Sequence, residues 1–142
     1  MFHTLAYYNT VLHRAFTAYT AERLGQVGLP FGLLFPVIYV GKHPGCTQAE
    51  LTKALGLDWG YSQRCVVKLT EESFLRREKQ GRAYHLSLLP RGEEAFALGH
   101  QVFFDWDRQA LAALTGDEQT QLLHLLTKIA GHGPSNERKE KS

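Results

Sequence analysis

The side chains best suited to hold an anionic partner lie between residues 47 and 82. Gln63, Arg64 and Lys68 fall on one face of a helical pattern. Arginine can donate paired hydrogen bonds to guanine O6 and N7 or to a phosphate, glutamine can pair with adenine, and lysine suits a phosphate. The other candidates are Thr47, Gln48, Trp59, Gly60, Tyr61, Arg76, Arg77, Lys79 and Arg82. Such residues suit double-stranded DNA, provided that the fold presents them as a helix-turn-helix and a wing would.

The same charges also fit a plain solvated surface, because runs of charge usually just face water. The net charge of +2 is too small to decide between the two interpretations. Its distribution is more informative, since residues 58–91 hold seven basic and four acidic residues, whereas residues 92–130 hold two and six. An anionic partner would therefore meet the middle of the chain.

Histidine and cysteine raise two further possibilities, metal binding and redox sensing. The seven histidines form no HxxxH pair and no cluster with the two cysteines, so we expect neither a metal nor a cofactor. Cys65 falls on an inward helix face, where an unpaired cysteine is usually a small buried hydrophobe. Cys46 precedes a helix, where we expect exposure and a lowered thiol pKa. No catalytic motif occurs, which argues against an enzyme.

Length and composition describe one globular unit. The chain has 142 residues, of which 44% are hydrophobic and 21% are charged, enough for a single core. Two cysteines outside any CxxC spacing suit a reducing compartment. The sequence lacks a signal-peptide pattern and any apolar run of about 18 residues. We therefore expect a cytoplasmic protein without a membrane partner.

Two helical patterns precede the candidate residues. Apolar side chains recur at steps of three and four and predict a helix over about 2–26. They are Leu5, Tyr8, Leu12, Phe16 and Tyr19. The apolar run over 31–40 predicts a second, mostly buried helix. Pro36 removes one internal hydrogen bond, so it should either kink this helix or mark its true start.

Capping residues define two short helices that must carry the candidate side chains. Thr47 and Glu50 form a capping box, which predicts a helix over 47–55. Gly56 ends it, and Asp58 caps a second helix that runs to about Ser73. Two short helices joined by a tight turn with glycine are typical of a helix-turn-helix. The second helix should bury Ser62, Cys65, Val66 and Leu69 and expose Trp59, Gly60, Gln63, Arg64, Val67 and Lys68.

A β-hairpin and two helices complete the pattern. Alternation of Tyr84, Leu86 and Leu88 predicts a strand over 83–88, with 74–78 as its partner and 79–81 as the turn. Helical patterns then follow over about 90–114 and 116–129, the second opened by another capping box. Residues 131–142 have almost no apolar side chains, so we expect a disordered tail.

This order of elements resembles the MarR family of regulators. HPGCTQAELTKALGLDWGYSQRCVVKLTEESFLRRE matches, without a gap, the family's turn, threonine-capped helix and recognition helix, and Arg64 falls on an arginine usual in the family. LTGDEQTQLLHLLTKI resembles the family's dimerisation helix. In place of the family's Asp-Arg-Arg run, the hairpin has a shorter tip, Gln80-Gly81-Arg82, and Ser73 replaces an expected glycine.

The resemblance implies a mainly α (α+β) fold, a winged helix-turn-helix with a two-stranded wing and long N- and C-terminal dimerisation helices. One domain would span 1–130, with a DNA-binding lobe at about 30–89 and dimerisation helices at about 2–27 and 90–130. It also implies a homodimer on a pseudo-palindromic operator, repression, and release by a small aromatic or lipophilic effector. The alternative is a winged-helix protein-interaction module without specific DNA binding.

We call the helices predicted over about 2–26, 90–114 and 116–129 the outer helices. Their aromatic side chains bear on both dimerisation and effector binding. They are Tyr7, Tyr8, Phe16, Tyr19, Phe103, Phe104 and Trp106. Most should belong to the core or to a dimer interface, because a two-fold protein buries matching apolar patches. In the MarR family, effectors often bind between the dimer helices and the DNA-binding lobe, and residues of this kind would line such a pocket.

Overall fold

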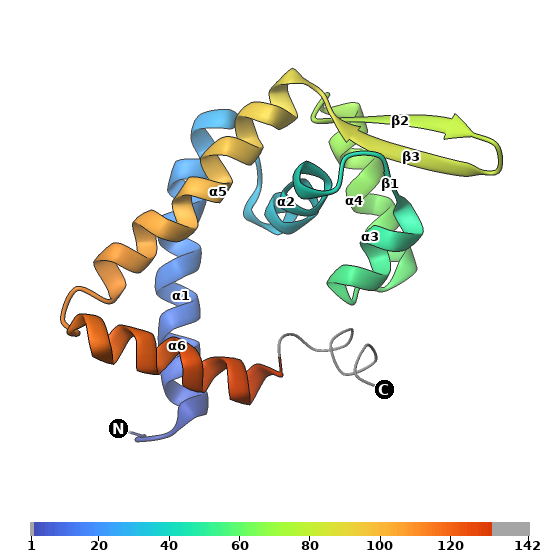
Figure 1. The fold of residues 1–142 in the computed structure, drawn as a ribbon. Helices are drawn as coiled ribbons and strands as arrows, with labels where there is room; N and C mark the ends of the chain where they lie inside the picture. The colour runs from blue at the N-terminus through green and yellow to red at the C-terminus, as the bar shows by residue number, and fades with distance from the viewer. Residues whose placement is uncertain (1, 132–142) are drawn as a thin grey trace.

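The computed structural model describes residues 2–131 as helices around a small antiparallel sheet (Figure 1). The elements, in chain order, are α1 (Leu5–Leu24), the short 3-10 helices η1 (Gly25–Val27) and η2 (Phe31–Leu33), α2 (Leu34–Lys42), β1 (Cys46–Thr47), α3 (Gln48–Leu55), α4 (Trp59–Glu71), β2 (Leu75–Gln80), β3 (Ala83–Leu88), α5 (Pro90–Ala110) and α6 (Gly116–Ala130). This order confirms the predicted fold class. The expected tail lies outside the described residues from position 132 onward.

The first two helices begin where backbone chemistry allows. The Thr4 hydroxyl caps α1 by accepting a hydrogen bond from the Tyr7 amide. The short helix η1 ends at Gly28, whose φ is 72°. Pro36 occupies the first turn of α2, where an amide hydrogen has no intrahelical acceptor. Of the two possibilities that the sequence left open, Pro36 therefore marks the start of a helix and does not kink one.

Both predicted caps of the helix-turn-helix are present. The Thr47 hydroxyl accepts a hydrogen bond from the Glu50 amide at 3.1 Å, and the Glu50 carboxylate accepts one from the Thr47 amide at 2.9 Å. The Asp58 carboxylate accepts the Tyr61 amide at 2.9 Å at the start of α4. Ser73 follows α4 at φ 66°, a left-handed conformation that favours glycine. Ser73 thus adopts the backbone conformation expected of the glycine that it replaces.

The sheet differs from the predicted hairpin in two ways. It has three strands in the order β1-β3-β2, because the two-residue β1 pairs Cys46 with Leu86. The hairpin turn is Gly81-Arg82 instead of 79–81, since β2 continues until Gln80 pairs with Ala83. Gly81 has φ 66°, as tight two-residue turns require. We call β2, β3 and this turn the wing, which Figure 1 shows extending from the helices.

The core lies where α2, α3, α4 and α5 meet the base of the sheet. Its largest fully buried side chains include Phe74, Leu34, Leu51, Leu69 and Leu86. α5 can approach closely at Gly92, where an added Cβ would lie 2.1 Å from the Phe74 carbonyl oxygen. α5 also packs along α1 and α2, so it connects the wing to these two helices.

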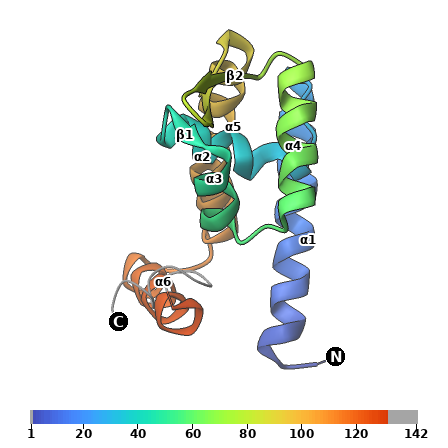
Figure 2. The same ribbon diagram turned by 90° about the vertical axis from the view of Figure 1, so that its right-hand side faces the viewer.

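The carboxyl-terminal helix lies apart from this core. The predicted capping box of Thr115 and Glu118 opens α6, and the chain turns over 111–113 instead of extending α5 to 114. Figure 2 shows α6 at the far end of α5, away from the sheet. None of its residues is buried. The apolar side of α6 is therefore open in the single chain.

Candidate nucleic-acid interface

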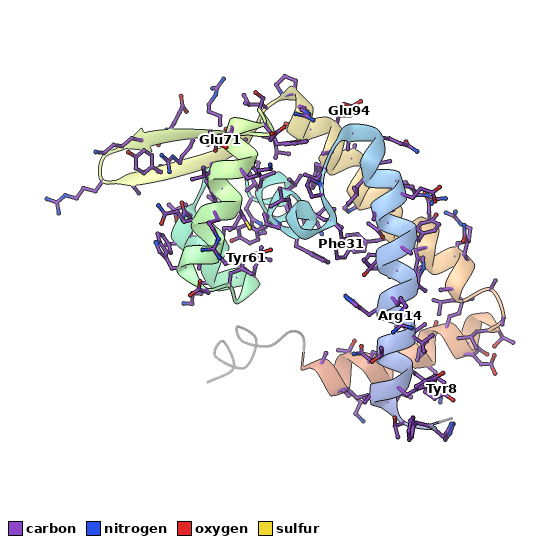
Figure 3. The ribbon with its side chains drawn as sticks, turned by 180° about the vertical axis from the view of Figure 1, so that it is seen from behind. Tyr8, Arg14, Phe31, Tyr61, Glu71 and Glu94 are labelled. Atoms are coloured by element: carbon purple, nitrogen blue, oxygen red, sulfur yellow. The ribbon has the colours of Figure 1, made fainter. Side chains whose placement is uncertain are left out.

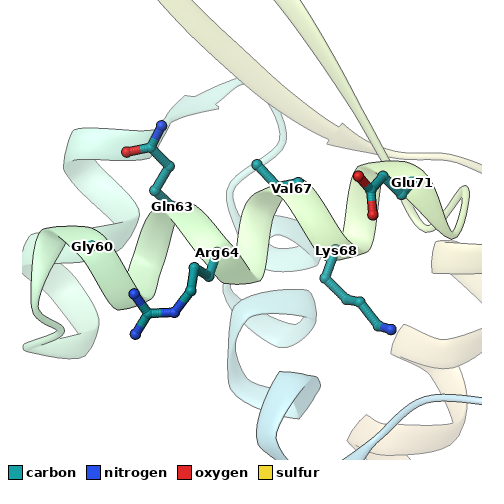
Figure 4. Close-up of a pocket in the computed structure, with 6 residues that line it drawn as sticks. All are labelled: Gly60, Gln63, Arg64, Val67, Lys68 and Glu71. Atoms are coloured by element: carbon teal, nitrogen blue, oxygen red, sulfur yellow. The ribbon is translucent and has the colours of Figure 1, made fainter.

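Helix α4 has the two faces that its sequence predicts. Ser62, Cys65, Val66 and Leu69 are all buried. The opposite side forms an open groove that we call the reading face (Figure 4). Its residues are Gly60, Gln63, Arg64, Val67, Lys68 and Glu71. A helix with one face in the core and a polar opposite face can enter a DNA major groove, which is wide enough for an α-helix.

The cations of the reading face are available to a ligand. Figure 4 shows Arg64 and Lys68 pointing to one side of α4 and Gln63 to the other. Within residues 2–131, neither Arg64 nor Lys68 forms an ion pair. The Arg64 guanidinium carbon lies 5.9 Å from the centre of the Tyr61 ring, which supports its extended position.

Two members of the reading face are not among the predicted DNA-binding residues, although the sequence did predict that Val67 is exposed. Val67, 40% exposed, presents an apolar surface that suits a thymine methyl group. Glu71 carries a carboxylate that could accept from cytosine N4. Figure 3 shows Glu71 at the wing end of α4 and Tyr61 at the other end. The helical step from Arg64 through Lys68, extended one turn, would have found Glu71.

Thr47, Gln48 and Trp59 meet the wing at a cleft of about 290 Å³, whereas Tyr61 lines a separate apolar pocket. The described residues that line it are Thr47, Gln48, Ala49, Trp59, Arg82, Ala83 and Tyr84. Trp59 is 52% exposed. Gln48 is only 8% exposed, and its amide nitrogen has no hydrogen-bond partner in the described part of the chain. The cleft brings together predicted residues that lie far apart in the sequence.

The wing divides its cations between two faces. Arg77 and Lys79 share the face of buried Leu75, and the Arg77 guanidinium carbon lies 4.3 Å from the centre of the Tyr84 ring. Arg76 lies on the other face, 3.9 Å from the Glu78 carboxylate. Arg82 occupies the turn. The positive charge on the Arg76 face is therefore partly neutralised, whereas that on the Arg77 face is not.

The prediction for Cys46 is wrong. Cys46 is 6% exposed because it belongs to β1, where its pairing with Leu86 turns the thiol into the core. Burial, with a smaller contribution from the Glu50 carboxylate, raises the pKa of this thiol to about 11. The expected lowering by a helix terminus does not occur. Cys65 is buried, as predicted.

The described residues contain neither a metal-binding cluster nor a single membrane-spanning helix. Between residues 2 and 131, no three His, Cys, Asp or Glu side chains lie together as a metal site would require. In the same range no single helix is long and apolar enough to cross a membrane. The segments Leu5–Val27 and Phe31–Lys42 reach that length and composition only when taken together, and they are bent by 85°. His85 instead binds the Gly45 carbonyl oxygen through Nδ1 at 2.8 Å.

An apolar pocket of about 430 Å³ lies between α2 and the helix-turn-helix. Its described lining consists of Phe31, Gly32, Phe35, Pro36, Ala54, Leu55, Leu57 and Tyr61. Figure 3 labels Phe31 and Tyr61, which come from its two sides. A hydrogen bond with Cys65 is the largest cause that raises the pKa of the Tyr61 hydroxyl. Tyr61 belongs to α4, so this helix contributes directly to the pocket lining.

Aromatic rings of the outer helices support one side of this pocket. Phe16 on α1 stacks on Phe103 of α5 with centroids 5.6 Å apart, and it meets Phe31 at 6.0 Å. Phe35 contacts Phe103 at 5.8 Å. Phe16 and Phe103 therefore lie behind the pocket, whereas its aromatic lining comes from Phe31, Phe35 and Tyr61. The sequence had suggested instead that aromatic residues such as Phe16 and Phe103 would form the lining.

Comparison with known proteins identifies the family. No family model matches the sequence. A MarR-family regulator from Listeria monocytogenes, solved with a 26mer DNA, superposes with a TM-score of 0.79 at 16% identity, covering 92% of this chain and 89% of that one. The HTH-type transcriptional regulator BilQ of Clostridium symbiosum is 41% identical over 129 residues, 89% of this chain and 90% of BilQ. The chain belongs to the MarR family of transcriptional regulators.

A further MarR-family structure contains a small aromatic molecule. The Rv2887 protein of Mycobacterium tuberculosis, solved with salicylic acid, superposes with a TM-score of 0.66 at 21% identity over 89% of this chain and 96% of that one. The Listeria and Clostridium relatives are both named as transcriptional regulators. The family resemblance predicted from the sequence is confirmed.

Proposed function

We propose that this MarR-family regulator binds double-stranded DNA as a homodimer and represses transcription by occupying a promoter. The observation that carries the proposal is the reading face of α4, where exposed Gln63, Arg64 and Lys68 lie opposite a buried face. A dimer seated on a promoter would exclude polymerase sterically. The protein would act in the cytoplasm as one domain over 1–130, without catalysis.

Each predicted residue has a proposed role at the DNA. Arg64 would donate to guanine O6 and N7, Gln63 would pair with adenine, and Lys68 would meet a phosphate. Thr47, Gln48, Trp59, Gly60 and Tyr61 would approach the backbone at the amino ends of α3 and α4. The wing cations would reach a phosphate or a narrow minor groove. They are Arg76, Arg77, Lys79 and Arg82.

The outer helices support the homodimer. α1 exposes Leu5, Tyr8 and Leu12 at 59%, 41% and 52%, and α6 exposes Leu125 and Ile129 at 46% and 63%. Contiguous apolar surface of this kind usually marks an interface. A two-fold dimer would cover these helices and hold two recognition helices about one DNA turn apart. The operator would then be a pseudo-palindrome.

The apolar pocket supports an effector site for a small aromatic or lipophilic molecule. Its lining joins Phe31 and Phe35, beside the outer helices, to Tyr61 on the recognition helix. Such an enclosure suits an apolar ligand with one polar group near the Tyr61 hydroxyl. An effector that binds one dimer geometry more tightly would shift the spacing of the recognition helices and release DNA. Salicylic acid in the Rv2887 structure supports this class of ligand.

A DNA titration tests the proposal against a winged-helix protein-interaction module. Fragments selected from a random library by the purified protein would be labelled and titrated at several salt concentrations, with a scrambled fragment as control. Phosphate contacts make log K fall linearly with log salt, by about 0.9 per neutralised phosphate. A steep slope with preference for the selected sequence supports the regulator. Weak, salt-independent binding to both fragments would favour the protein-interaction module.

A further inference from the structure

Arg91, near the start of α5, binds the end of the recognition helix. Its Nη1 donates to the Glu72 carbonyl oxygen at 2.7 Å and lies 3.4 Å from the Glu72 carboxylate. Glu72 is the capping residue at the carboxyl end of α4. The guanidinium carbon also lies 4.2 Å from the centre of the fully buried Phe74 ring. A cation at this end of a helix is favoured by the helix dipole.

The same guanidinium packs against the end of the first helix. Gly28 follows η1, and a Cβ built on it would lie 2.6 Å from Nη2 of Arg91. The absence of a side chain at Gly28 therefore leaves the space that the guanidinium fills. One side chain at the start of α5 thus contacts the end of α4, the Phe74 ring that follows it, and the segment after η1.

We infer that Arg91 is a positioning residue that fixes the orientation of α4 relative to α1 and α5. A planar guanidinium can hold a carbonyl, lie on a ring and fill the space at Gly28 at once, whereas a lysine ammonium cannot. The inference rests on the proposed function, because α1 and α5 set the frame of the proposed dimer. Loosening this contact would let each recognition helix tilt within that frame.

The consequence is selectivity for the spacing between half-sites. Two recognition helices reach successive major grooves only if each is held at a fixed orientation. With Arg91 present, inserting or deleting one base pair between the half-sites should cost much affinity. Without Arg91, each recognition helix can change its tilt. The native operator should then bind less tightly, and a change of spacing should reduce the affinity by a smaller factor.

The test compares R91Q and R91K with two control variants. R108Q removes another α5 arginine, whose ion pair with Asp105 stays within α5, and E72Q removes the carboxylate but keeps the carbonyl acceptor. Kd is measured for the native operator and for operators changed by one base pair, at several salt concentrations. R91Q should bind the native operator about tenfold more weakly, because a loosened recognition helix must be ordered when it binds DNA. Its discrimination against altered spacing should also fall.

The other variants and readouts separate the explanations. R91K should recover only part of the discrimination, while E72Q and R108Q should behave as the unsubstituted protein does. The salt slope should stay unchanged in R91Q, so a slope reduced by one phosphate contact would overturn the inference. The inference would also be overturned if folded R91Q or R91K discriminated between the native and altered spacings as strongly as the unsubstituted protein does. If the unsubstituted protein itself ignores spacing, the proposed dimer on a palindromic operator fails instead.

Discussion

Arg64 combines an exposed position, no described ion pair and a place at the centre of the reading face. Lys68 shares these properties one helical turn away, but its ammonium lacks the paired geometry of a guanidinium. We therefore expect Arg64 to recognise a base edge and Lys68 to attract a phosphate.

Replacement of Arg64 by alanine should cost about 1–3 kcal/mol of binding free energy, because a bidentate base contact is lost. Fluorescence anisotropy with operators substituted one base at a time would show specificity relaxed at one position. If Arg64 instead touches phosphate, all sequences should weaken equally. R108A is the matched control, and unchanged affinity in R64A would contradict the placement of α4 in the groove.

The buried Cys46 thiol should resist alkylation in the native protein. Its pKa of about 11 keeps it protonated at pH 8, and reaction requires the thiolate. Mass spectrometry after iodoacetamide treatment should find Cys46 modified only when denaturant is present. Rapid native modification at pH 8 would contradict both the burial and the pKa.

The same pKa also predicts a pH dependence of stability. The pKa of Cys46 in the folded protein exceeds the value of about 8.5 expected for an unfolded thiol. The stabilisation that comes from keeping this thiol protonated is therefore fully present below about pH 8.5. It should be lost as the pH rises through about 11. Urea unfolding curves measured across this range would show the free energy of unfolding falling, and a smaller fall in C46A would assign the effect to Cys46.

At the scale of elements, the wing has a charged face and a partly neutralised face. R77Q should weaken DNA binding and reduce the salt slope by about one, whereas R76Q should change both less because Glu78 already pairs with Arg76. E78Q is the complementary variant and should strengthen binding. Equal losses in R76Q and R77Q would contradict the division of the wing into two faces.

The sequence predicted elements well where local chemistry determines them. Thr47 and Asp58 cap their helices because side-chain oxygens satisfy nearby amides, whatever the rest of the fold does. The buried and exposed faces of α4 followed from helical periodicity. β1 was missed because two residues carry no periodic signal, and its pairing partner lies on distant β3. The error at Cys46 has the same cause. The end of β2 was missed because its exposed residues do not alternate.

At the scale of the whole molecule, the outer helices expose apolar residues that the proposed dimer would cover. Replacing both Leu125 and Ile129 by lysine should separate the dimer and lower DNA affinity by more than tenfold, since two half-sites then bind independently. Analytical ultracentrifugation would follow the mass. Exposed Gln121, replaced by lysine, is the control on the same helix. A double variant that remains a dimer would exclude α6 from the interface.

The pairing of β1 with β3 also determines which parts of the chain open together. The Gly45 amide donates to the Leu86 carbonyl oxygen at 2.7 Å, and Thr47, the second residue of β1, caps α3 directly. A turn, a wing strand and a helix therefore share one set of hydrogen bonds. In native-state hydrogen exchange, the Gly45 amide should exchange as slowly as the amides of β3, in a single cooperative unit with the amino end of α3.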